Sequence, residues 1–237
     1  MMRNTQFGTT PLVAHGQGPH DFKPYWDIVC DRFFASPRQW IGPIPELTIL
    51  TWNNGNEGMG LLERSLSHLG IPGLVTGAGI REWVNSTHKP LLTAEAVNTI
   101  ETEYVMGIDS RDAILLGDPR AILDTFNSAF DAELVFSADQ LNWPNLKRFR
   151  SFENDIPGAS ASEFRYLNSG AWIGRTRFCR EFFAAAARTA PAPEAPEVDQ
   201  GIFKQVFQIY YPKVQLDYRC AMFQNLGFVA KPIIEVL

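Results

Sequence analysis

The amino-acid sequence predicts an α/β fold, with a mostly parallel sheet and helices on both of its faces. Short β-rich runs alternate along the chain with segments of helical spacing, which is typical of βα units. One such run, residues 46–52, precedes the polar, glycine-containing segment 53–58 and then a helical pattern. A strand, a glycine loop and a helix in this order predict a ligand-binding βα unit.

The helix after this loop is expected to start near Met59, because Leu62 and Leu66 follow helical spacing. Gly70 and Pro72 then end it. The other elements expected in the first half are strands at 10–14 and 73–76, a helix around 90–102, and a strand ending at Asp109.

In the second half, the Pro/Ala-rich segment 190–196 cannot be helical throughout and is expected to be a loop. The short basic cluster 147–150 is interpreted as a solvated loop. The remaining expected elements are a helix from Pro119 to Phe130, a strand at 133–137, a strand or turn at 166–174, helices at 176–188 and 199–210, and strands at 214–217 and 228–236.

Composition limits the class of protein. The chain has 237 residues, of which 45% are hydrophobic and 20% charged, so one substantial core and a single domain over 1–237 are expected. A net charge of -5 argues against a nucleic-acid partner, which would require a basic stripe. Three widely spaced cysteines without a CxxC motif indicate neither a disulfide framework nor a zinc site. No signal-like start or apolar run of about 20 residues is found, so we expect a cytoplasmic protein without a membrane partner.

Two carboxylates, Asp109 and Asp112, follow the buried run at the start of segment 104–117. Strand ends are where α/β folds place ligands, and two carboxylate oxygens suit a hard divalent cation that carries phosphate. The imidazole of His15, in the turn His15 to Gly18, can complete the shell of such a metal. The alternative is that the two carboxylates are solvated surface groups.

Five segments resemble, in the same order and at similar spacing, the glycosyltransferase domain of the procollagen lysine hydroxylase/glycosyltransferase family: DSRDAILLGDP (109–119), LVFSADQLNWP (134–144), RYLNSGAWIG (165–174), VDQGIF (198–203) and LDYRCAMFQNL (216–226). The resemblance implies a GT-A-like, Rossmann-like mixed sheet flanked by helices. It also implies a UDP-sugar donor, Mn²⁺ as cofactor, and transfer of a hexose, glucose or galactose, to a hydroxyl acceptor. The acceptor can be a glycan, a peptide or a small molecule.

The order of one motif departs from that family. A segment like PLVAHGQGP lies near the C-terminus of the family's domain, whereas here it occupies residues 11–19. We therefore expect a circular permutation. Segment 1–40 would then carry the metal-histidine loop, and 44–237 the nucleotide-sugar-binding and acceptor parts. The 10–14 strand should then lie close to Leu237 and flank the strand that ends at Asp109.

The resemblance implies a role for several side chains, each of which also has a structural interpretation. Asp109, Asp112 and His15 would form a mixed oxygen and nitrogen shell that suits Mn²⁺. The other implied contacts are Thr51 and Ser110 with the uridine portion and Lys89 near it, Asn168 and Ser169 with the sugar, and Trp143 as a wall of the sugar pocket. Their structural alternatives are an ordinary strand threonine, a tight turn at 168–170, and a packing tryptophan at a loop base.

Asp199, followed by Gln200, matches the end of the family's acidic run, where aspartates face the donor sugar. Val198 stands where the family carries another aspartate. Asp199 is expected to orient a sugar hydroxyl or to stabilise oxocarbenium-like charge. The alternative is that it caps the helix expected at 199–210.

The loop around His15 carries the remaining predicted residues. Gln17 replaces the family's usual Asn, beside Gly18. The loop followed by Lys23 is also similar, more weakly, to the HxxGxxKPW motif of glycogenin-like transferases, in which the lysine binds a donor phosphate. Lys23 is therefore expected at the β-phosphate, with a surface lysine as the alternative.

Two other classes of function stay open. The first is a catalytically silent nucleotide-sugar or carbohydrate-binding module, which the missing aspartate at Val198 favours. The second is a metal-dependent phosphohydrolase that uses Asp109 and Asp112, which lacks a second carboxylate cluster and an obvious nucleophile.

Overall fold

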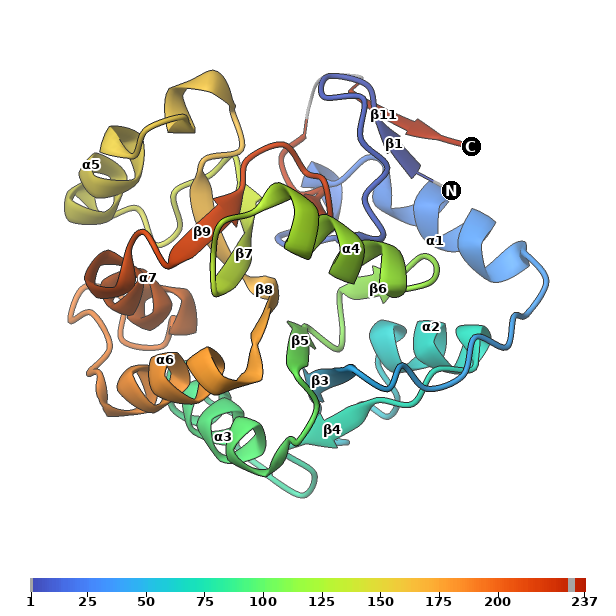
Figure 1. Ribbon diagram of the computed structural model, residues 1–237, viewed down its shortest axis with the longest axis horizontal. Helices are drawn as coiled ribbons and strands as arrows, with labels where there is room; N and C mark the ends of the chain where they lie inside the picture. The colour runs from blue at the N-terminus through green and yellow to red at the C-terminus, as the bar shows by residue number, and fades with distance from the viewer. Residues whose placement is uncertain (1, 230–232) are drawn as a thin grey trace.

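A computed structural model describes residues 2–229 and 233–237. Its centre is a six-stranded sheet with the order β4-β3-β5-β8-β7-β9 (Figure 1). The strands β3, β4 and β5 are parallel to one another, as are β7 and β9, and β8 runs antiparallel between β5 and β7. The mixed, mostly parallel sheet is thereby confirmed. Its strands are β3 (Leu47–Trp52), β4 (Leu74–Thr76), β5 (Tyr104–Ile108), β7 (Leu134–Asp139), β8 (Tyr166–Arg175) and β9 (Val214–Asp217).

Helices flank this sheet, and α3, α6 and α7 pack against one another beside it (Figure 1). Their buried positions are mostly apolar, as expected for elements that cover a sheet. None of the helices formed by the described residues is long and apolar enough to cross a membrane. The helices are α1 (Trp26–Ala35), α2 (Leu61–Leu69), α3 (Asn85–Thr99), α4 (Arg120–Ala129), α5 (Lys147–Asp155), α6 (Thr176–Arg188) and α7 (Asp199–Tyr210), with short 3-10 turns at His20–Phe22 and Ala159–Ala161.

A second, three-stranded sheet joins a segment near the beginning of the chain, a segment near its end, and the segment that follows Asp112. Its central strand β2 (Val13–His15) pairs antiparallel with β6 (Ala113–Leu115) and parallel with β10 (Phe223–Asn225). His15 lies opposite Ala113 on one side and Asn225 on the other. Because β6 starts directly after Asp112, this pairing carries the histidine to the carboxylate loop.

The first and last strands also pair with each other. β1 (Met2–Asn4) runs antiparallel to β11 (Ile234–Val236), with Met2 opposite Val236 (Figure 1). The side-chain amide of Asn4 donates to Gln224 at 2.8 Å, which ties this ribbon to the second sheet. The two ends of the chain therefore lie side by side, and β2 lies beside the Asp109 loop through its pairing with β6. The expected closeness of Leu237 to the 10–14 strand stays a prediction.

Several expected elements are corrected by the structure. The basic cluster predicted as a loop opens α5, because Phe149 and Glu153 turn one face of that segment into the core. The helix expected from residue 90 begins at Asn85, so that Pro90 lies inside it. The first predicted strand is shifted to Val13–His15, and the last is confined to Ile234–Val236, with residues 230–232 outside the described part.

A buried ion pair joins α7 to α5. Lys204 and Glu153 are each 1% exposed, and their charged atoms are 2.7 Å apart. Burial raises the pKa of Glu153 and lowers the pKa of Lys204, so each group depends on the other to stay charged. Lys204 also donates to Asn142 at 2.9 Å, and the Leu167 amide donates to Glu153 at 2.6 Å. The pair therefore fixes the loop before Trp143 as well as the two helices.

Replacing Lys204 by alanine should lower the free energy of unfolding by about 3–5 kcal/mol, because it leaves a buried carboxylate without its partner. Urea denaturation followed by circular dichroism measures this loss. The matched control is Lys213→Ala on the exposed surface, where a change within about 0.5 kcal/mol is expected. A Lys204→Ala protein as stable as this control would show that the pair does not hold α5 and α7 together.

Candidate active site

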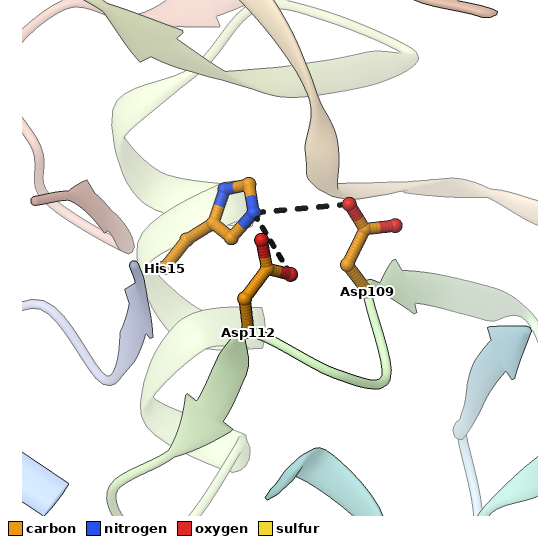
Figure 2. Close-up of side chains that lie close together, drawn as sticks. All are labelled: His15, Asp109 and Asp112. Atoms are coloured by element: carbon orange, nitrogen blue, oxygen red, sulfur yellow. Dashed lines mark ion pairs between the residues drawn. The ribbon is translucent and has the colours of Figure 1, made fainter. Parts of the chain in front are cut away.

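Three of the predicted site residues converge at the end of β5. The Nε2 atom of His15 is 3.4 Å from Asp112 and 3.7 Å from Asp109, and one ligand atom from each residue lies within 4.8 Å of the others (Figure 2). The amide of Gly16 donates to the Asp112 carbonyl at 2.7 Å, and the Leu226 amide donates to the His15 carbonyl at 2.8 Å. The backbone thus holds the histidine against the carboxylate loop from two sides.

The imidazole of His15 also has its orientation set by its neighbours. Its Nδ1 atom is 2.8 Å from the Asn225 side-chain oxygen, and the amide nitrogen of Asn225 donates to the Ala138 carbonyl. That second bond leaves the Asn225 oxygen as an acceptor, so Nδ1 must carry a proton. Beneath the ring lies Gly170, where a Cβ atom would come within 2.1 Å of the imidazole. The histidine therefore presents Nε2 to the two carboxylates.

This donor set fits a divalent metal ion. Nε2 of His15 is buried and has no hydrogen-bond partner among the residues that the structure describes. Burial alone would lower the pKa of His15, but the charges of Asp112 and Asp109 outweigh it and raise the pKa to about 9. Burial would raise the pKa of Asp112, but His15 lowers it to about 2. A cation is electrostatically favoured between these groups, and a mixed oxygen and nitrogen shell suits a metal such as Mn²⁺.

Lys89 connects this cluster to Asp199. Its ammonium lies 2.6 Å from Asp109, 3.3 Å from Asp199 and 3.2 Å from the Ser169 carbonyl. Burial would lower the pKa of Lys89, but the two carboxylates outweigh that effect and raise it. The ammonium also lies 4.8 Å from the ring of Trp52, on the floor of the site. Lys89 thus neutralises part of the negative charge that would otherwise push Asp109 and Asp199 apart.

Two cavities meet at these carboxylates. The first, of about 530 Å³, is lined mainly by polar side chains of the loop after β3 and by Arg81 and Trp83. The second, of about 480 Å³, extends from His15 towards Trp143 and Phe228. The residues common to both linings are Asp109, Asp112 and Asp199. The candidate metal centre therefore stands at the junction between two binding spaces.

The other predicted residues divide between these cavities. Lys89 and Ser110 line the first, although the Ser110 hydroxyl donates to Glu63 at 2.6 Å. Gln17, Gly18, Trp143, Asn168, Ser169 and Gln200 line the second.

Thr51 and Lys23 are not among the described residues that line either cavity. The Thr51 hydroxyl is fully buried and donates to the Ile108 carbonyl at 2.7 Å, so it stabilises the sheet. The ammonium of Lys23 donates to the Gly16 carbonyl at 2.6 Å. The predicted contacts of Thr51 with uridine and of Lys23 with a donor phosphate stay predictions, for two residues that lie outside both linings.

Two structural alternatives are wrong. The cap of α7 is Val198, without a side-chain hydrogen bond, and the Asp199 carboxylate instead accepts the Ser169 hydroxyl at 2.9 Å. Residues 168–170 lie inside the long strand β8 and do not form a tight turn. Gln200 accepts the Ser169 amide and donates to the Trp143 carbonyl at 2.6 Å, which ties the tryptophan loop to the site.

Asp139 is a site residue that the sequence analysis missed. It ends β7, lines the second cavity, and is 4% exposed. Burial raises its pKa, opposed by hydrogen bonds from the Leu141 amide, Gln17 and Asn168. The signal was available, because Asp139 follows a buried strand as Asp109 does. Asn225 was missed as well, because its role of orienting the His15 imidazole follows only from its position opposite His15 in the paired strand.

The comparison with known proteins decides the family. A family model described as the PLOD GT domain matches residues 45–234. The chain belongs to this family. Its glycosyltransferase domain implies a nucleotide-sugar donor and an acceptor. Of the predicted metal ligands, Asp109 and Asp112 lie within the matched range, whereas His15 lies before it.

Curated relatives of this PLOD GT domain are much longer proteins. The chain is 29% identical over 142 residues to a procollagen-lysine,2-oxoglutarate 5-dioxygenase of Drosophila melanogaster, covering 57% of the chain and 18% of the relative. It is 29% identical over 130 residues to procollagen-lysine,2-oxoglutarate 5-dioxygenase 1 of Homo sapiens, covering 53% and 16%. It is also 26% identical over 137 residues to the uncharacterized protein R699 of Acanthamoeba polyphaga mimivirus, covering 57% and 27%.

Replacing Asn225 by alanine should weaken Mn²⁺ binding by about 10- to 100-fold, because the imidazole of His15 loses the acceptor that fixes its orientation. Calorimetric titration of the purified protein with MnCl₂ measures the affinity. Asn145→Ala, on the exposed surface, is the matched control and should bind like the wild type. Equal affinities for the two variants would exclude a supporting role for Asn225.

Proposed function

We propose that this PLOD GT domain transfers a hexose, glucose or galactose, from a UDP-sugar to a hydroxyl acceptor with Mn²⁺ as cofactor. The observation that carries the proposal is the junction of two cavities at the cluster of His15, Asp109 and Asp112. A group-transfer enzyme needs two binding spaces that open on one reacting centre. A metal at this junction would touch the leaving group from one side while the acceptor enters from the other.

The first cavity suits the nucleotide. Asn54 and Asn56 carry amide groups that can pair with the polar edge of a base, and Trp83 offers an aromatic surface. The carboxylates at the junction would repel a diphosphate, so a cation is needed to bring the two together. When bound, Mn²⁺ would supply this charge and stabilise the departing UDP, held by His15, Asp109 and Asp112.

Asp199 is the residue best placed to act on the donor sugar. It is 7% exposed, accepts the Ser169 hydroxyl, and belongs to both cavity linings. The Lys89 ammonium lies 3.3 Å from its carboxylate. A carboxylate in this position can orient a sugar hydroxyl or stabilise the positive charge that develops at the anomeric carbon. Trp143 would close the outer side of the same space.

A second function, a catalytically silent nucleotide-sugar or carbohydrate-binding module, is favoured by Val198 in place of the family's aspartate. Against it stands Asp139, a second buried carboxylate that lines the second cavity. Asp139 and Asp199 thus place two carboxylates around one cavity, which is more than the binding of a neutral sugar requires.

Circular permutation remains part of the proposal. The pairing of β1 with β11 and of β2 with β10 supports it. A chain in which the present first and last residues were connected, and which was opened at another loop, could form the same strand pairs. The family match covers residues 45–234, so the His15 strand lies before the matched part, as a segment moved to the front would.

The protein should hydrolyse or transfer from UDP-glucose or UDP-galactose in the presence of Mn²⁺. Asp199→Asn should lower this turnover by about 100-fold or more, because the neutral amide cannot stabilise developing positive charge. Release of UDP measures the rate, and binding of Mn²⁺ with UDP should be unchanged in the variant. A wild-type protein that binds UDP with Mn²⁺ but releases none from either donor would establish the binding module instead.

UDP should stabilise the protein against heat only when Mn²⁺ is present, because the diphosphate contacts the junction through the metal. At a ligand concentration of about 100 Kd the gain corresponds to about 2.7 kcal/mol. Differential scanning fluorimetry with Mn²⁺ and with EDTA measures the difference. An equal rise in Tm under both conditions would contradict binding through the metal.

A further inference from the structure

A third cavity, of about 420 Å³, lies between the end of α1 and the outer face of α2. These two helices lie on the same side of the molecule (Figure 1). The cavity shares none of its described lining residues with the two cavities of the candidate active site. Its volume is in the range of sites for small molecules. It is therefore a binding space that the proposed sugar transfer does not use.

The lining of this cavity is basic, although the whole chain has a net charge of -5. Arg38, Arg64 and His68 line it, and no carboxylate is among the described residues that do so. The ion pairs of arginine within the described part of the chain include neither Arg38 nor Arg64. The hydrogen bonds of arginine side chains there do not include them either. Both guanidinium groups therefore keep their donors for a ligand.

An aromatic ring, and not a carboxylate, positions Arg64. Its guanidinium carbon lies 4.8 Å from the centre of the Phe34 ring. A guanidinium over an aromatic face keeps its in-plane N–H groups free to donate to oxygen atoms. Ser67 and His68 follow Arg64 by three and four residues, so they lie on the same face of α2.

The inner wall of the cavity is packed. His68 is 7% exposed, and its ring lies 4.9 Å from the Phe33 ring and 6.0 Å from the Phe34 ring, between centroids. The amide of Gln39 donates to the His68 carbonyl at 3.0 Å, which holds the segment of Arg38 against the end of α2. The two arginines therefore reach one space from separate segments of the chain.

We propose that this cavity binds a phosphate monoester, with Arg38 and Arg64 donating to the phosphate and the exposed Ser67 adding a hydroxyl donor. A phosphate monoester has three terminal acceptor oxygens, which match two forked guanidinium groups and a hydroxyl better than a carboxylate does. Phe34 and the 63% exposed Met59 give the organic part of the ligand an apolar surface. The site is independent of sugar transfer at the candidate metal centre.

A soluble ester and the headgroup of phosphatidic acid carry the same phosphate, and two probes distinguish these sources. Calorimetric titration with glycerol 3-phosphate in metal-free buffer tests the soluble ester. Without metal, the carboxylates of the candidate active site repel a phosphate. Flotation with phosphatidylcholine vesicles, with and without phosphatidic acid, tests the lipid. The wild type should bind glycerol 3-phosphate with a Kd of about 1 mM or tighter, or bind the vesicles only when they contain phosphatidic acid.

Arg38→Ala and Arg64→Ala should each weaken the binding seen with the wild type by about tenfold or more, because each removes charge-assisted hydrogen bonds. Ser67→Glu keeps both arginines, places a carboxylate in the cavity and should abolish binding. Glutamate is a better helix former than serine, so α2 stays folded in this variant. The matched control is Arg177→Ala on the exposed surface of α6, away from all three linings, which should bind like the wild type.

A wild type that binds neither glycerol 3-phosphate nor the phosphatidic acid vesicles would overturn the proposal. Equal binding by Arg38→Ala, Arg64→Ala and Arg177→Ala would also overturn it, because the phosphate would then lie elsewhere. Glycerate carries a carboxylate in place of the phosphate and should bind about tenfold more weakly or less. Glycerate binding as tight as that of glycerol 3-phosphate would contradict a site built for phosphate.

Discussion

The site depends on one contact, the placement of His15 against the loop from Asp109 to Asp112. That contact is not local, because the histidine arrives on a strand from the beginning of the chain and is held between β6 and β10. Gly170 makes room for the ring, and Asn225 sets its orientation. Each of these residues comes from a different strand, so the geometry of the candidate metal centre is a product of the whole arrangement of the two sheets.

Charge is the second constraint on the centre. Asp109, Asp112, Asp139 and Asp199 surround a small volume, and among the described residues Lys89 and His15 are the cationic partners in contact with the first, second and fourth of them. Like charges so close together destabilise the fold unless they are compensated. Four carboxylates with two cationic partners leave a negative potential in this volume, which favours binding of a positive ion.

The alternation of strands and helices was sufficient to predict the sheet, because buried strands and amphipathic helices have different periods. The strand-end rule also located Asp109, and the same rule applied to β7 would have located Asp139. By contrast, the Thr51 hydroxyl is bonded to the carbonyl of Ile108, on a strand distant in sequence, and the Lys23 ammonium is bonded to the carbonyl of Gly16 in its own loop. Neither bond could be read from the motif that suggested the residue. Segment 147–155 buries Glu153 against Lys204, a partner that comes from a distant segment and could not be read from the local sequence.

The junction of the two cavities has a consequence for how a bound sugar is kept from water. A nucleotide-sugar bound in the first cavity would have its reacting carbon facing a second space that is open until another molecule fills it. Water in that space is then a competing nucleophile, and nothing in the first cavity can exclude it. The fidelity of transfer therefore rests on how completely the occupant of the second cavity displaces solvent from the junction. A poorly fitting occupant would waste the donor even while the chemistry at the metal was intact.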